Sequence, residues 1–394
     1  MSDMLNEIFP AERISDVKEY YFSRKLREIA RLNADGADII SLGVGGPDRM
    51  PADNVISTLC DEAHSPTSHG YQPYVGIAEL REAFSWWYGK HYNVELDASS
   101  EILPLIGSKE GILHTTLAFV NPGDGVLVPN PGYPTYTSVS RLAQAEIFNY
   151  NLLEENDWLP DFDELERLPL ERIKLMWVNY PNMPTGRCAS MELFRKLVDF
   201  GIRHQIVIVN DNPYSFILND HPLSIFNVPE AKEIAIEMNS LSKSHNMPGW
   251  RVGMLAARKE FVQWILRVKS NVDSGQFRPV MLAAAEALHC GKEWYEKLNE
   301  EYGERRAIAE QIMSTMNCKF DAEQKGLFLW GKIPDSAADA EQFADYILND
   351  ARVFIVPGSV FGSNGSRFVR LSLCANKDML RKALQRVLEL NDND

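Results

Sequence analysis

The sequence has no long apolar run, no paired cysteines and no excess of basic residues. No apolar stretch approaches the ~18 residues needed to span a bilayer, and the N-terminal segment MSDMLNEIFPAER is too polar for a signal peptide. The five cysteines are scattered and never form a Cys-x-x-Cys pair, so neither a disulfide framework nor a metal site is expected. Acidic residues outnumber basic ones by 55 to 40, which disfavours a nucleic-acid or anionic-membrane partner. We therefore expect a reduced, soluble, cytoplasmic protein.

The chain is longer than a single typical core requires. With 394 residues, 45% of them hydrophobic, it is expected to form two lobes. We predict an N-terminal arm over residues 1–45 that joins the small domain. A large domain is predicted over residues 46–285, and a small C-terminal domain over residues 286–394.

Short apolar runs alternate with amphipathic helical stretches in the middle of the chain. Strands are predicted at residues 101–107, 125–129, 145–152, 173–180, 206–211, 233–239 and 251–257. Between several of them lie helices such as 191–204, where Leu193, Leu197 and Phe200 share one face. This alternation predicts an α/β fold with a mostly parallel sheet sandwiched by helices. After about residue 280, a long helical region precedes strands within 326–334, 351–358 and 366–374, which predicts a smaller α+β domain.

Polar side chains gather in the loops that follow the predicted strands, and in an open α/β sheet such loops face one crevice. Gly107, Ser108 and Lys109 form a small-residue turn at a helix start, where free backbone N–H groups favour a phosphate; an ordinary tight turn is the alternative. Tyr133 lies in a loop stiffened by prolines. Asp211 ends an apolar strand, where a carboxylate is costly unless it meets a cation; otherwise it is a helix N-cap.

The segment SLSKSHNMPGWRVGM, residues 240–254, places one lysine among small polar residues. A lysine is usually a solvated surface charge, but Lys243 lies in a loop between two predicted strands, where α/β proteins tend to place chemistry. Ser240, Ser242 and Arg251 accompany it. Taken with the other loops, they describe a site for a flat, phosphorylated, cationic ring that a lysine amine reaches, which is a description of pyridoxal phosphate.

The order of these motifs resembles the class I/II aminotransferases of the fold-type I pyridoxal-phosphate family. The resemblance runs through ISLGVGGPD, YQPYVGIAELREA, GSKEG, NPGYPTY, NYPNMPTG, DNPY, SLSKSHNMPGWRVG, VPGSVFG and FVRLSL. NVDSGQF is most similar to the subgroup of LL-diaminopimelate and aspartate-type aminotransferases. The resemblance implies a ping-pong exchange of an amino group between an L-amino acid and a 2-oxo acid, through a lysine Schiff base.

The resemblance also implies a role for each matched residue. Lys243 matches the lysine of the Schiff base and the base that moves the Cα proton, Asp211 the acid paired with the pyridine nitrogen, and Tyr214 the phenol on the ring's 3-oxygen. Tyr133 matches the aromatic stacked on the ring. Further cofactor contacts are implied for Gly107, Ser108, Lys109, Asn182, Ser240, Ser242 and Arg251.

Substrate and subunit contacts follow from the same resemblance. Arg370 matches the arginine that clamps the substrate α-carboxylate in a bidentate fork, with Gly45 and Asn182 beside the substrate. Tyr71 matches a residue that reaches the phosphate in the neighbouring subunit, which implies a homodimer with shared active sites.

One position departs from the family pattern. Where relatives read Asn-Pro-Thr-Gly, this chain has Met183, which cannot donate to the 3-oxygen, so either Asn182 takes the role or Tyr214 acts alone. With fewer donors on that oxygen, we expect the lysine–cofactor linkage to titrate at a higher pH than in relatives. Identical midpoints for wild type and Met183→Asn, in a pH titration of the visible band, would contradict this expectation.

Other functions remain open on the same residues. A carbon–sulfur β-lyase would use the same lysine, aspartate and arginine, and pyruvate release from a cysteine conjugate without an oxo acid would indicate it. A ligand-sensing regulator would carry an N-terminal DNA-binding domain, for which too few residues precede ISLGVGG. An acidic substrate would need a second cation, for which Arg49, Lys269 and Arg278 are candidates. Of the histidines, which lack metal spacing, His245 is the one to test.

Overall fold

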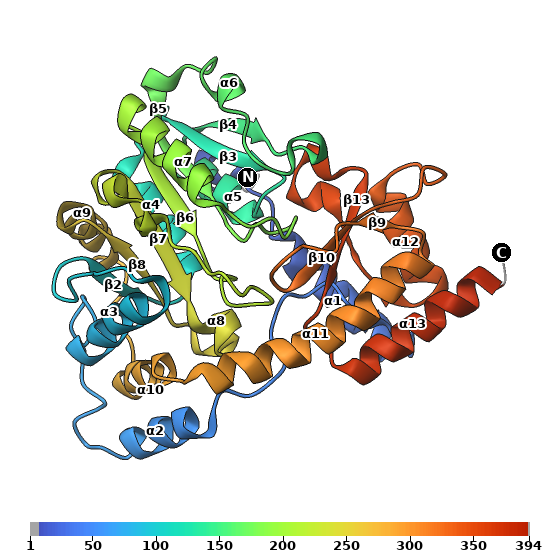
Figure 1. Ribbon diagram of the computed structural model, residues 1–394, viewed down its shortest axis with the longest axis horizontal. Helices are drawn as coiled ribbons and strands as arrows, with labels where there is room; N and C mark the ends of the chain where they lie inside the picture. The colour runs from blue at the N-terminus through green and yellow to red at the C-terminus, as the bar shows by residue number, and fades with distance from the viewer. Residues whose placement is uncertain (1–7, 393–394) are drawn as a thin grey trace, which may run out of the picture.

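The computed structural model describes residues 8–392, and its largest sheet has seven strands (Figure 1). Their order is β2 (Ile102–Leu105), β8 (Gly253–Ala257), β7 (Ala235–Ser240), β6 (Val207–Asp211), β5 (Ile173–Val178), β3 (Gly125–Asn130) and β4 (Glu146–Asn151). Strands β7, β6, β5, β3 and β4 pair in parallel, and β8 runs antiparallel to both of its neighbours. The predicted mostly parallel sheet is confirmed.

Helices cover both faces of this sheet. One face packs against α3 (Ala78–Tyr92), α7 (Met191–His204) and α10 (Arg278–Leu288), and the other against α4 (Ser108–Phe119), α5 (Pro134–Leu142) and α9 (Lys259–Lys269). Successive strand residues point to opposite faces, so Met176 joins the first core while Trp177 joins the second. The other α-helices described in this half are α2 (Asp53–Ala63), α6 (Phe162–Leu165) and α8 (Leu241–Ser244).

Helix α7 illustrates how the sequence sets an element. The Ser190 hydroxyl oxygen accepts a hydrogen bond from the backbone N–H of Leu193 at 3.1 Å, which satisfies one donor of the first turn. Leu193, Leu197 and Phe200 are all buried, as their spacing predicted. The apolar stripe of this helix therefore fixes which of its faces meets the sheet.

A third core holds the rest of the chain together. It contains α1 (Tyr21–Ala34), α12 (Ala340–Asp350) and α13 (Lys377–Asp392), and an antiparallel sheet in the order β12 (Val356–Pro357), β13 (Phe368–Ser372), β10 (Phe328–Lys332) and β9 (Lys319–Phe320). Strand β1 (Ile40–Ser41) pairs in parallel with β11 (Val353–Phe354), so residues near the N-terminus pack with the C-terminal part.

Helix α11 (Lys292–Thr315) spans the two halves (Figure 1). Tyr295 near its start packs into the core of the large sheet, and Ile312 near its end packs into the third core. The predicted α/β fold with a smaller α+β part is confirmed. The exact domain limits stay a prediction, and the limit at residue 285 falls inside α10.

Candidate active site

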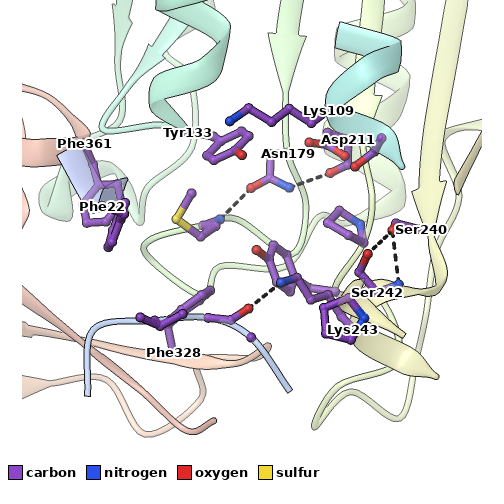
Figure 2. Close-up of a pocket in the computed structure, with 18 of the residues that line it drawn as sticks. Phe22, Lys109, Tyr133, Asn179, Asp211, Ser240, Ser242, Lys243, Phe328 and Phe361 are labelled. Carbon is purple, nitrogen blue, oxygen red and sulfur yellow. Dashed lines mark hydrogen bonds between the residues drawn. The ribbon is translucent and has the colours of Figure 1, made fainter. Parts of the chain in front are cut away.

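A cavity of about 470 Å³ lies between the large sheet and the third core. From the sheet side it is lined by Asp211 at the end of β6, Ser240 at the end of β7 and Asn179 immediately after β5. From the other side come Phe328 of β10 and Arg370 of β13. Figure 2 shows these walls facing one another across the cavity. Its volume falls in the range of small-molecule sites, which is about 300–1,000 Å³.

Most of the residues singled out in the sequence meet at this cavity. Eleven line it: Gly45, Ser108, Lys109, Tyr133, Asp211, Tyr214, Ser240, Ser242, Lys243, Arg251 and Arg370. Gly107, Asn182 and Tyr71 are not among the lining residues. Gly107 lies directly behind the lining at the start of α4, whereas Tyr71 is 93% exposed on the protein surface.

Lys243 lies in the short helix α8, directly after β7. Ser240 caps this helix, since its hydroxyl oxygen accepts from the backbone N–H of Ser242 at 3.2 Å. The Lys243 amine donates to the backbone carbonyl of Gly45. Burial lowers the pKa of this amine, because a charge is poorly solvated there. An amine with a lowered pKa is better able to act as a nucleophile and as a base near neutral pH.

Asp211 is a buried carboxylate with one oxygen unbonded. The Tyr136 hydroxyl donates to its Oδ2 at 2.9 Å, while Oδ1 has no partner within residues 8–392. Burial raises the pKa of Asp211 to about 6, against the opposing effects of the Tyr136 hydrogen bond and the Lys243 charge. The Tyr136 ring is held in place by stacking on Trp177, with 5.0 Å between ring centroids. A buried, half-satisfied carboxylate is expected to recruit a cationic donor.

The start of α4 and Arg251 form a corner suited to an anion. Gly107 precedes the helix with a φ of 76°, and Arg251 also has a left-handed φ, of 57°. The guanidinium packs so closely on Gly107 that a Cβ there would lie 2.1 Å from its Nη2. The free N–H groups of the first helical turn and the neighbouring guanidinium both favour negative charge. Ser108, Lys109, Ser240 and Ser242 line the cavity with this corner.

Arg370 is a buried cation with few strong acceptors. Its Nη2 donates to the carbonyl of Gly43 at 2.7 Å, its Nη1 lies 3.1 Å from the Met183 sulfur, and its Nε has no partner among the described residues. A thioether is a weak acceptor. The guanidinium carbon lies 3.9 Å from the Phe328 ring centroid and 4.6 Å from that of Phe361. Burial lowers the pKa of Arg370 to about 10, which still leaves it charged at neutral pH and matched to a carboxylate.

The turn after β5 holds the two asparagines that precede Met183 in different ways. The Asn182 side-chain oxygen accepts from the Thr185 hydroxyl at 2.8 Å, so it is used within its own turn, away from the cavity lining. Asn179 does line the cavity. Its amide nitrogen donates to the carbonyl of Asp211 at 2.5 Å, and its oxygen accepts from the backbone N–H of Met183 at 2.7 Å.

Several lining residues were not identified from the sequence: Tyr20, Phe22, Tyr136 and Asn179. Tyr136 and Asn179 stand inside the motifs NPGYPTY and NYPNMPTG, so their positions were visible although their roles were not. The two N-terminal aromatic residues carry no local pattern that would place them near a lysine more than 200 residues later. Only the tertiary fold brings them there.

The candidates for a second substrate cation do not line the cavity. Lys269 pairs with Asp273, Arg278 pairs with Glu79 at 2.7 Å, and Arg49 is absent from the lining. His245 is buried behind the lysine, where its Nε2 lies 3.2 Å from the Tyr295 hydroxyl. Burial lowers its pKa to about 3, so it is neutral at physiological pH. Within residues 8–392 there is no cluster of metal-binding side chains, and no helix combines the length and apolar character needed to cross a bilayer.

Comparisons with known proteins agree with this geometry. The family model "Aminotransferase class I and II" matches residues 37–387. An LL-diaminopimelate aminotransferase of Maridesulfovibrio salexigens is 39% identical over 96% of this chain and 98% of its own length, and one of Aquifex aeolicus is 38% identical with the same coverage.

Solved structures give the same result. The apo-BacF structure from Bacillus subtilis has a TM-score of 0.93 and 34% identity, and covers 98% of both chains. A Thermus thermophilus aspartate aminotransferase mutant has a TM-score of 0.90 and 25% identity over 98% of this chain and 100% of its own. These relatives are aminotransferases or fold like them, and they give no support to the lyase alternative. The chain belongs to the class I and II aminotransferase family and is an enzyme that transfers amino groups.

Proposed function

We propose that this chain binds pyridoxal phosphate in the cavity and exchanges an amino group between an L-amino acid and a 2-oxo acid. The observation that carries the proposal is that Lys243, Asp211, Arg251 and Arg370, which come from three separate segments of the chain, line one cavity. Two buried polar atoms at its wall, Asp211 Oδ1 and Arg370 Nε, lack partners among the described residues, and a cofactor and a substrate carboxylate would supply them. When bound, pyridoxal phosphate supplies the aldehyde that takes the amino group and the ring that delocalises the Cα electron pair.

The lining residues fit each part of that cofactor. Asp211 would hold the protonated pyridine nitrogen, because an ion pair offsets the burial that now raises its pKa. Tyr214 would donate to the 3-oxygen, and Tyr133 would lie against the ring face. Arg251 and the first turn of α4, with Ser108 and Lys109, would hold the phosphate, with Ser240 and Ser242 beside them. Gly107 allows Arg251 to approach this turn.

Lys243 and Arg370 would account for the amino-group transfer. Lys243, whose pKa is lowered by burial, would bind the cofactor at its carbonyl carbon and would serve as the base for the proton on the substrate Cα. Arg370 fixes the α-carboxylate, which orients the Cα–H bond toward the lysine. The Gly45 carbonyl accepts a hydrogen bond from the Lys243 amine. Gly45 would therefore lie beside both the lysine and the substrate.

The working form is proposed to be a homodimer in which Tyr71 reaches the phosphate of the partner's site. This explains why a large aromatic side chain stands almost fully exposed next to half-exposed Tyr74. An exposed hydroxyl near a phosphate would add a charge-assisted hydrogen bond. Two of the relatives are LL-diaminopimelate aminotransferases, which makes LL-diaminopimelate one of the substrates to test.

The test is the visible absorption of the purified protein, before and after single amino acids are added without an acceptor. We expect a visible band that shifts to the ultraviolet with the preferred amino acid, and a Lys243→Ala variant that shows neither. Exposed Lys259→Ala is the matched control and should behave as wild type. A protein that shows no band after incubation with the cofactor, or a Lys243→Ala variant indistinguishable from wild type, would overturn the proposal.

A further inference from the structure

The charged residues of the cavity are fully used by the proposed cofactor and the substrate α-carboxylate. Of the described residues, Asp211 is the only acidic one in the lining, and the cations are Lys109, Lys243, Arg251 and Arg370. Asp211, Lys243 and Arg251 are assigned above to the cofactor, and Arg370 to the carboxylate. Lys109 is assigned to the phosphate as well, and its amine also lies 4.3 Å from the Tyr20 ring centroid, in a cation–π contact.

The surface around Arg370 is aromatic. Phe328 and Phe361 pack against its guanidinium, and the Phe22 ring centroid lies 5.3 Å from the guanidinium carbon. Tyr20 and Phe22 come from the start of α1, and both line the cavity. Figure 2 shows Phe22 beside Phe361 at one end of the cavity. The side chain of an amino acid starts two bonds from its carboxylate carbon, so a substrate whose carboxylate binds Arg370 has the start of its side chain close to these rings.

We propose that the substrate side chain recognised here is aromatic, and that Tyr20, Phe22, Phe328 and Phe361 form its pocket. An uncharged ring needs no partner charge and gains from edge-to-face contacts with other rings. A second carboxylate or ammonium, as in aspartate or LL-diaminopimelate, would be desolvated against aromatic walls, where the described lining residues of this chain offer no opposite charge that is still free. This inference rests on the proposed function and narrows its substrate class.

The first experiment compares amino acids as donors to the cofactor-loaded enzyme. L-phenylalanine is expected to shift the visible band at a concentration at least tenfold lower than L-leucine, L-aspartate or LL-diaminopimelate. A preference for leucine or for either charged substrate would overturn the aromatic pocket while leaving the aminotransferase function intact. If no amino acid shifts the band, both proposals fail.

Binding of a non-reacting acid gives a second readout, independent of turnover. By calorimetry on the cofactor-loaded enzyme, 3-phenylpropionate should bind more tightly than succinate, and Phe22→Leu should weaken it by about two- to tenfold. For L-alanine, which has no ring, the same variant should raise the half-saturation for the band shift by a smaller factor than it weakens 3-phenylpropionate binding. Phe119→Leu is the matched control, because Phe119 packs on Phe261 and Trp264 away from the cavity. Equal binding of the two acids, or an equal loss for L-alanine and 3-phenylpropionate in Phe22→Leu, would contradict the proposal.

Discussion

At the scale of single residues, Asp211 carries a stability cost that its proposed role would explain. Its pKa is raised by burial from 3.8 to about 6 in the protein without cofactor. Between these two values the folded state keeps a proton that the unfolded state releases. The free energy of unfolding therefore falls as the pH rises through this window. The carboxylate is kept in an unfavourable place, and a cationic ring nitrogen would make that place favourable.

Replacing Asp211 by asparagine should stabilise the cofactor-free protein at pH 8. The gain is expected to be roughly 2–3 kcal/mol, because one pKa unit corresponds to about 1.4 kcal/mol and the buried charge disappears. Near pH 4 the gain should vanish, since wild-type Asp211 is then protonated. The measurement is chemical unfolding at both pH values.

A matched control uses Asp273, an aspartate whose pKa is lowered in the folded protein, whereas that of Asp211 is raised. Burial acts to raise the pKa of Asp273, but the Lys269 hydrogen bond and charge together with the backbone N–H of Gly275 outweigh it and lower the pKa, so Asp273→Asn should destabilise the protein at pH 8. A loss of stability in cofactor-free Asp211→Asn at pH 8 would show that its burial is not the dominant effect. Aminotransferase activity of the same variant should fall by about 10²–10³-fold, as for the loss of a preorganised electrostatic partner.

The residue scale is also where the sequence was least informative. Lys243, Asp211 and Arg370 could be named in advance because motifs of several residues surround them. Asn179, whose amide lines the cavity, could not be named in advance, because NYPNMPTG contains two asparagines. The hydrogen bonds that hold Asn182 within its turn and Asn179 against Asp211 depend on the folded turn. Whether Tyr214 alone serves the 3-oxygen, with the higher titration midpoint expected from that, stays a prediction.

At the scale of elements, the turn from β2 into α4 depends on one glycine. Gly107 has a φ of 76°, and a Cβ at this position would lie 2.1 Å from the Arg251 guanidinium. Gly107→Ala therefore adds backbone strain of about 1–2 kcal/mol and also displaces the arginine assigned to the phosphate. We expect the dissociation constant for pyridoxal phosphate to rise at least tenfold, measured by titration of the visible band.

Gly123 separates these two effects. It also has a positive φ, of 87°, but nothing lies within 4 Å of a Cβ built on it. Gly123→Ala should lose a similar amount of stability and keep its cofactor affinity. If the two variants lose affinity equally, the close approach of Arg251 to Gly107 has no functional meaning.

Element prediction succeeded where a pattern of several residues repeats. The seven strands of the large sheet and α7 were predicted because apolar runs and helical periodicity are long enough to stand out. Strands β1 and β9 were missed, since each has two residues and exists only through pairing with a distant partner. The parallel order of the sheet followed from the alternation of elements, but the antiparallel placement of β8 required the structure.

At the scale of the whole molecule, two neighbouring loops expose apolar side chains together. Tyr71 and Tyr74 lie in the loop before α3, and Val272 and Phe277 lie in the loop before α10. The loops touch, because a Cβ on Gly275 would lie 2.8 Å from the Gln72 carbonyl oxygen. Clustered exposed apolar groups indicate an interface. A second copy of this chain is the occupant that would also carry Tyr71 into a phosphate site.

A subunit-mixing experiment tests this arrangement. Lys243→Ala and Tyr71→Phe homodimers should each be impaired, the first completely and the second through the lost phosphate contact. After the two are unfolded and refolded together at equal concentration, half of the dimers should be mixed. Each mixed dimer would hold one site with both changes and one with neither, because a shared site takes its lysine and its tyrosine from different chains. About a quarter of all sites in the mixture should then be wild type, and the recovered activity should be about a quarter of that of the wild-type enzyme.

The control refolds each variant alone, which should restore nothing. A double variant with both substitutions on one chain provides a second control. Mixed with wild type, it should give heterodimers in which each site carries one of the two changes. None of these sites is wild type, so the mixture should be less active than it would be if every heterodimer contributed one wild-type site. Activity in the first mixture equal to the mean of the two parents would mean that Tyr71 serves its own subunit or no site at all. The exposed loops would then need another partner.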